Sequence, residues 1–183
     1  MINIFVSDIF GKTEALEALA SGVASNYLIL DPYEGQDMKF ESERNAYQYF
    51  SENVGLQAYS EKLEQCMAEI DTSVNLIGFS VGASAIWKVS NRLSLPSVNH
   101  AICFYGSQIR HHRRVKPLFP VSLIFPHQEQ HFSVPELVDE LSSVHNVEIK
   151  EVPYLHGFMN KLSDNFNQTG YESGLEMLSV ELD

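Results

Sequence analysis

The stretch NLIGFSVGASAIW, residues 75–87, joins an apolar run to a helical pattern of small residues through one serine set between two glycines. A buried strand, a sharp turn and a helix in this order form a nucleophile elbow, which exposes a serine hydroxyl at the edge of a parallel sheet. Ser80 would then have a strained backbone with positive φ, and Gly78 and Gly82 would let the strand and helix pass closely. The alternative is a tight turn with an incidental serine. The stretch therefore predicts a nucleophile at Ser80, with the Val81 amide as an oxyanion donor.

Outside this stretch, short apolar runs rich in β-branched residues alternate with longer segments of helical period. The alternation is typical of an α/β three-layer sandwich, in which helices cover both faces of a mostly parallel sheet. The predicted strands are Ile2–Val6, Tyr27–Leu30, Val74–Phe79, His100–Tyr105, Val121–Phe125 and Val147–Val152. Helices are predicted for TEALEALA closed by Gly22, Leu56–Ile70, residues 83–92, SVPELVDEL and Tyr171–Leu178. Residues 31–43 are predicted to form a polar, acidic loop, whose conformation the sequence does not define.

Size and composition narrow the classes of function. With 183 residues, 44% of them hydrophobic, the chain suits a single domain over residues 1–183 without a cap domain. Its 24 acidic and 12 basic residues give a formal net charge of −12, which repels nucleic acid and anionic lipid. The few cysteines, the absence of a signal-like N-terminus and the absence of a spanning apolar run predict a cytoplasmic protein without membrane contact. The composition leaves open whether it is a monomer or a homodimer.

A nucleophilic serine needs a base, and the base needs a group that fixes its tautomer. Of seven histidines, His156 in VPYLHGFMN follows the last predicted strand, at the sheet edge where Ser80 lies. Glu129 follows the strand before, so the chain order is nucleophile, acid and histidine. Asp139 and Asp164 stay open as alternative acids. The residues thus predict a triad of Ser80, His156 and Glu129.

Together with IFG after the first strand, DPY after the second and FYG after the fourth, the serine motif and HGFMN resemble the dienelactone hydrolase family of the α/β-hydrolase fold. The resemblance spans nearly the whole chain. It implies a trimmed version of that fold, with six parallel strands in the order 2-1-3-4-5-6. It also implies the Ile9 amide as the second oxyanion donor, with Asp8 near the nucleophile. Members often carry cysteine and aspartate where this chain has Ser80 and Glu129.

The expected reaction is hydrolysis of a small carboxylic ester, thioester or lactone through an acyl-enzyme on Ser80, with no metal or other cofactor. The partner is then a small-molecule acyl substrate. The expected substrate contacts are Asp8, Phe79, Arg110 and Asn160. Asn160 stands four residues after His156, at a position where the resemblance implies an arginine that binds the substrate carboxylate. The missing arginine weighs against the particular lactone after which the family is named.

Two other interpretations stay open. The pocket of a hydrolase fold can serve a catalytically weak or inactive binding protein, since a fold does not guarantee its function. Gly11-Lys12-Thr13 lies between a predicted strand and helix, as in the phosphate loop of a nucleotide-binding protein. However, Val6 stands where that motif has its first glycine, and Ile9 and Phe10 are bulky where amides would wrap phosphate.

Overall fold

The computed structural model describes residues 1–92 and 97–182, and six strands form one sheet in this part of the chain. They are β1 (Ile2–Val6), β2 (Tyr27–Leu30), β3 (Val74–Phe79), β4 (Val98–Phe104), β5 (Val121–Pro126) and β6 (Val147–Val152). All neighbours pair in parallel, in the order β2-β1-β3-β4-β5-β6. The predicted strand order is therefore confirmed, with bounds that differ from the prediction only in β4 and β5.

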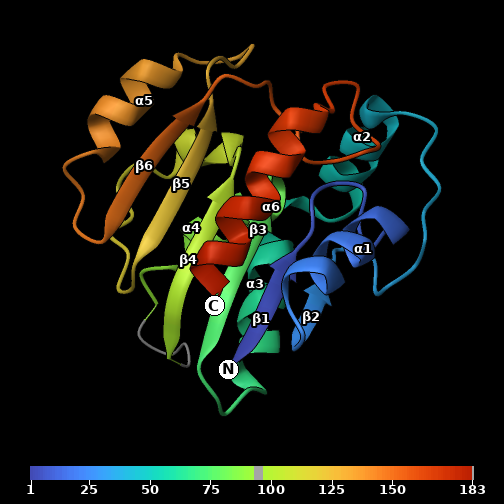
Figure 1. Cartoon of the computed structure of the whole chain (residues 1–183), viewed down its shortest axis with the longest axis horizontal. Helices are drawn as coiled ribbons and strands as arrows, with labels where there is room; N and C mark the ends of the chain where they lie inside the picture. The colour runs from blue at the N-terminus through green and yellow to red at the C-terminus, as the bar shows by residue number, and fades with distance from the viewer. Residues whose placement is uncertain (93–96, 183) are drawn as a thin grey trace.

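Helices cover both faces of the sheet (Figure 1). The buried side chains form two hydrophobic clusters. One includes residues of α1 (Glu14–Val23) and α6 (Gln168–Leu182). The other includes residues of α2 (Glu43–Asn53), α3 (Gly55–Ala68), α4 (Val81–Val89) and α5 (Val134–Leu141). Strand β3 is buried along its whole length, as expected for a central strand covered on both sides. None of the described helices is both long and apolar enough to cross a bilayer.

The helices depart from the sequence predictions at several places. Helix α1 continues through Gly22 to Val23, because nothing lies near that exposed glycine and a single glycine is tolerated in a helix. Helix α2 was not predicted, since it buries only Ala46 and Phe50 and so lacks a clear apolar stripe. Helix α4 begins at Val81 and ends earlier than residue 92, and α6 extends beyond the predicted Tyr171–Leu178 at both ends.

The turn between β3 and α4 has the strained geometry that its glycines predict. Ser80 has a φ of 51°, in a region that side chains rarely adopt. A Cβ atom on Gly82 would lie 2.2 Å from the Val6 carbonyl oxygen and 2.5 Å from that of Ser7. A Cβ on Gly78 would lie 2.6 Å from the Ile86 side chain. The first turn of α4 is therefore in direct contact with the end of β1.

Replacing Gly82 by alanine is expected to lower the free energy of unfolding by about 3 kcal/mol, because the added methyl overlaps main-chain atoms that cannot rotate away. The matched control is Gly22→Ala, where the new methyl meets nothing within 4 Å. That variant should gain about 0.5 to 1 kcal/mol from better helix propensity. Urea unfolding of both variants measures the effects, and a Gly82→Ala protein as stable as wild type would contradict the close approach.

Candidate active site

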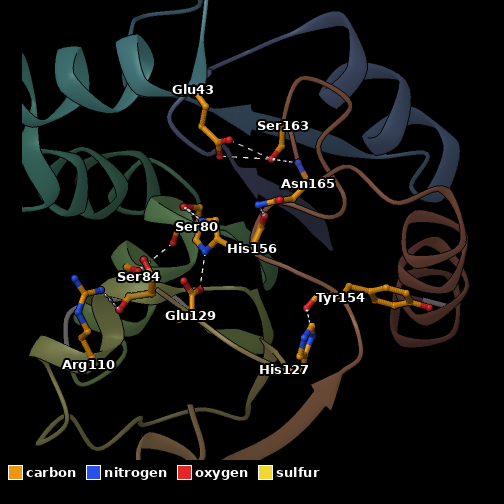
Figure 2. A network of polar contacts seen from close by, with 11 residues as sticks. Glu43, Ser80, Ser84, Arg110, His127, Glu129, Tyr154, His156, Ser163 and Asn165 are labelled. Atoms are coloured by element: carbon orange, nitrogen blue, oxygen red, sulfur yellow. Dashed lines mark hydrogen bonds and ion pairs between the residues drawn. The ribbon is translucent and has the colours of Figure 1, made fainter. Parts of the chain in front are cut away.

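Three side chains from separate loops meet at the carboxyl edge of the sheet (Figure 2). Ser80 lies between β3 and α4, whereas Glu129 and His156 lie in the loops after β5 and β6. The Ser80 Oγ lies 2.9 Å from His156 Nε2, and His156 Nδ1 lies 2.7 Å from Glu129 Oε1. Because an ionised carboxylate only accepts hydrogen bonds, Nδ1 carries the proton in this pair. The lone pair of Nε2 then faces the serine hydroxyl, as a general base requires.

The three groups are mostly withdrawn from water. Ser80 is 8% exposed, and the side chains of Glu129 and His156 are 10% and 25% exposed. Among the described carboxylates, Glu129 is the one bonded to His156, whereas Asp139 and Asp164 are exposed on the surface. The geometry therefore favours Glu129 over the two alternative acids.

The loop that carries His156 is fastened at several points (Figure 2). The Asn165 amide donates a 3.0 Å hydrogen bond to the His156 carbonyl oxygen. The Ser163 hydroxyl lies 3.4 Å from a carboxylate oxygen of Glu43 and so connects the loop to α2. Gly157 has a φ of 84°, and a Cβ there would lie 2.4 Å from Ser163 Oγ. These contacts hold the imidazole through its backbone.

The turn after β1 forms a wall beside the triad. The Asp8 carboxylate accepts hydrogen bonds from the Phe10 N–H, at 2.9 Å, and from the Asn160 amide. Burial raises the pKa of the Asp8 carboxyl, while these two hydrogen bonds act in the opposite direction. This carboxyl lines one cavity with Tyr105, whose ring lies next to that of His156. Asp8 and Asn160, 152 residues apart in the chain, thus form one pair at the site.

Three of the four predicted substrate contacts line one cavity: Asp8, Phe79 and Asn160. Tyr105 also lines it, and its ring centroid lies 5.1 Å from that of His156. Apolar and aromatic side chains form much of the remaining wall, among them Leu16, Leu19, Met159 and Tyr171. Ser80, Glu129 and His156 are not among the residues that line this cavity, which approaches the triad through Tyr105. It offers an apolar surface with a few polar groups, as small-molecule sites commonly do.

Tyr105 was missed as a site residue by the sequence analysis, although it belongs to the FYG motif. Its φ of 42° is unusual for a residue other than glycine. Its hydroxyl is buried and has no hydrogen-bond partner of acceptable geometry among the described residues, although the Met159 backbone lies near it. A strained residue with a free buried hydroxyl marks this end of β4 as part of the site.

Arg110 lies apart from this cavity, in the short helix Ser107–His111 that follows β4. Its guanidinium donates a 2.6 Å hydrogen bond to the Ser107 carbonyl and stacks 5.2 Å from the centre of the Phe132 ring. The structure therefore does not bring Arg110 together with the other three predicted contacts. The sequence could not indicate this position of Arg110, because it depends on the hydrogen bond that the side chain makes to Ser107 in the same segment.

The Gly11-Lys12-Thr13 motif makes ordinary helix-start contacts. The Thr13 hydroxyl caps α1 by accepting the Leu16 N–H at 3.2 Å, and Lys12 pairs with Glu17 at 3.3 Å. Val6 is a strand residue of β1. These contacts give the motif a structural role and offer no support for nucleotide binding. Among the described residues, no three His, Cys, Asp or Glu side chains gather as a metal site would require.

Comparison with known proteins places this geometry in context. A sequence model of the dienelactone hydrolase family matches residues 4–178. The uncharacterized protein YczH of Bacillus subtilis (strain 168) is 29% identical over 182 residues, which cover 96% of this chain and 89% of that protein.

Two solved structures share the fold. One is a dienelactone hydrolase-like promiscuous phosphotriesterase from metagenomic libraries, with a TM-score of 0.64 and 12% identity over 98% of this chain and 85% of that one. The other is Est1E from Butyrivibrio proteoclasticus with bound ferulic acid, with a TM-score of 0.63 and 12% identity over 99% of this chain and 87% of that one. At these identities the likeness concerns the fold alone. Together with the strand order it confirms the predicted α/β-hydrolase architecture.

The buried Asp8 carboxyl is expected to make stability depend on pH. Because burial raises its pKa in the folded protein, the stability that the protonated group supplies is present below its ordinary pKa and is lost as the pH rises through the raised one. In the Asp8→Asn variant the side chain at position 8 cannot ionise. Its amide faces Asn160 at every pH, so this contact is the same in both measurements.

The stability of wild type relative to Asp8→Asn should therefore be greater at about pH 4 than at about pH 7. Urea unfolding of both proteins at both pH values measures the difference. The exposed Asp139→Asn variant serves as a control that should show no such trend. A relative stability that rises with pH would contradict the assigned environment of Asp8.

Proposed function

The chain belongs to the dienelactone hydrolase family, and from this premise we propose that it hydrolyses a small carboxylic ester, thioester or lactone through an acyl-enzyme on Ser80. The observation that carries the proposal is the continuous chain of contacts through His156, at 2.9 Å to Ser80 Oγ and 2.7 Å to Glu129 Oε1. A hydroxyl, an imidazole and a carboxylate connected in this way are the parts that activate a serine for acyl transfer.

In the first half of the reaction, Ser80 Oγ attacks the acyl carbon while its proton passes to His156 Nε2. Glu129 keeps the imidazole in register and stabilises the cation that forms. When the tetrahedral intermediate collapses, His156 returns the proton to the leaving alcohol or thiol and the acyl group stays on Ser80. In the second half, His156 removes a proton from water, which attacks the acyl carbon. As the bond from that carbon to Ser80 Oγ breaks and the acid leaves, His156 returns the proton to Ser80 Oγ.

The oxyanion would be held by the amides of Val81 and Ile9, each contributing about 3 kcal/mol to transition-state stabilisation. Val81 is the first residue of α4, so its N–H belongs to the unsatisfied first turn of a helix. The turn that contains Ile9 follows Ser7, whose carbonyl contacts the start of the same helix at Gly82. This proximity supports a site in which the two amides face the same oxygen.

The cavity beside Asp8 and Phe79 supports a short acyl group. Its walls include several apolar side chains. Longer acyl chains would have to displace Leu16, Leu19 or Tyr171.

Ser80→Ala should abolish hydrolysis, with a loss of about six orders of magnitude in kcat, because no other group can form the acyl-enzyme. The measurement is turnover of short p-nitrophenyl esters, thioesters and lactones by both proteins, with urea unfolding to show that the variant folds. Equal residual activity in wild type and variant would contradict the proposal. A folded wild type that turns over none of these substrates would favour the binding-protein interpretation.

Glu129→Gln should lower kcat by about 10³-fold to 10⁴-fold. A glutamine amide can donate to Nδ1, which moves the imidazole proton to Nε2 and leaves no lone pair for the Ser80 proton. The matched control is Asp139→Asn, which neutralises an exposed carboxylate and should leave kcat unchanged. Full activity of Glu129→Gln, or an equal loss in both variants, would show that Glu129 is not the triad acid.

A further inference from the structure

We infer that Tyr33 is a positioning residue, whose hydroxyl fixes the peptide that follows Ile9 and so restricts rotation at Ile9, which keeps the Ile9 amide in the preceding peptide aimed at the oxyanion before substrate binds. The inference rests on the proposed function, since it takes the Ile9 amide as an oxyanion donor. Tyr33 ends the DPY motif at residues 31–33, which the triad does not use. The structure gives this motif a specific task at the site.

The contact between Tyr33 and Ile9 is short and shielded. The Tyr33 hydroxyl donates a 2.7 Å hydrogen bond to the Ile9 carbonyl oxygen, and Tyr33 is 7% exposed. Water therefore competes little for this bond. Gly11 makes the approach possible, because a Cβ there would lie 2.7 Å from the Tyr33 ring and its φ is 78°. The turn after β1 is thus shaped to receive the ring.

Tyr33 is itself held in place from several sides. The buried Asp31 carboxylate accepts hydrogen bonds from the Tyr33 N–H at 2.7 Å and from the Gly35 N–H at 2.8 Å. The ring packs edge-on against Phe40 and Tyr49, with centroids 5.6 Å and 5.8 Å away. The hydroxyl therefore cannot leave the Ile9 carbonyl without disturbing this cluster.

The peptide on the other side of Ile9 is fixed as well. The Asp8 carbonyl oxygen accepts the Gly11 N–H at 3.1 Å and the Ser7 hydroxyl at 3.1 Å. In a trans peptide the N–H points opposite to the carbonyl, so the Ile9 N–H points away from Gly11 and Ser7. With Tyr33 holding the following peptide, both planes that meet at Ile9 are constrained. An oxyanion donor gains most of its effect from such preorganisation.

The fixed turn lies beside the reacting groups. Its Ser7 carbonyl contacts α4 at Gly82, and its Asp8 side chain lines one cavity with Tyr105, which packs against His156. A change in the direction of the Ile9 amide would therefore be felt in the transition state, whereas the cavity that receives the substrate would keep its walls. This predicts an effect on kcat rather than on KM.

The test is Tyr33→Phe, which removes the hydroxyl and keeps the ring. The variant should lose between about 10-fold and 100-fold in kcat with KM unchanged. Its affinity for a trifluoromethyl ketone, whose adduct with Ser80 carries an oxyanion, should fall by the same factor. Tyr49→Phe is the matched control, since it removes a hydroxyl from the same aromatic cluster but does not touch Ile9, and it should behave as wild type.

The burst of p-nitrophenol released in the first turnover counts the active sites in each preparation. Dividing each rate by this count removes the effect of unfolded protein, so a loss of stability alone changes neither kcat nor inhibitor affinity. Gly11→Ala gives a second variant, in which the added methyl pushes the Tyr33 ring away while the φ of 78° also strains the turn whose Gly11 N–H holds the Asp8 carbonyl, so its loss in kcat and inhibitor affinity should be at least as large as that of Tyr33→Phe. Wild-type kcat and inhibitor affinity in Tyr33→Phe, or equal losses in Tyr33→Phe and Tyr49→Phe, would overturn the inference while the proposed function stands. A wild type without esterase, thioesterase or lactonase activity would overturn both.

Discussion

The close approach of helix α4 to the end of β1 is the constraint on which the rest of the site depends. At Gly82 the helix lies so near the carbonyls of Val6 and Ser7 that a side chain would overlap them. Because α4 begins at Val81, directly before this contact, the chain leaves β3 through the positive φ of Ser80. Such strain costs on the order of 1 to 3 kcal/mol and persists only where the surroundings impose it. The buried strand β3 and the packed start of α4 supply those surroundings.

The parallel sheet brings the other loops of the site next to the turn between β3 and α4. The carboxyl ends of parallel strands meet at one edge, so the loops after β1, β3, β5 and β6 converge there. Each loop is then secured by its own contacts, as Gly157 and Asn165 secure the His156 loop. The sheet brings the side chains of the site close together, and the short polar contacts within the loops orient them.

The sequence predicts those parts that depend on burial and local backbone rules. Most of the six strands were found because they are compact apolar runs, β6 because its apolar residues alternate with charged ones, and the turn at Ser80 because its glycines permit strain. His156 and Glu129 were found because each follows a strand at the same edge. By contrast, α2 has only a weak apolar pattern, and the exposed Gly22 was wrongly read as a helix end. Pairings such as Asp8 with Asn160, or Tyr33 with Ile9, join loops far apart in the chain, so tertiary packing decides them.

The central claim is that a covalent acyl group forms on the elbow serine during turnover. The most direct measurement is to mix the protein with a slowly hydrolysed ester, quench in acid during turnover and analyse the peptides by mass spectrometry. The account predicts a mass increase equal to the acyl group on the peptide that contains Ser80, which disappears once the ester is consumed. Hydrolysis that proceeds with no acyl group on Ser80, or with the acyl group on a different side chain, would contradict it.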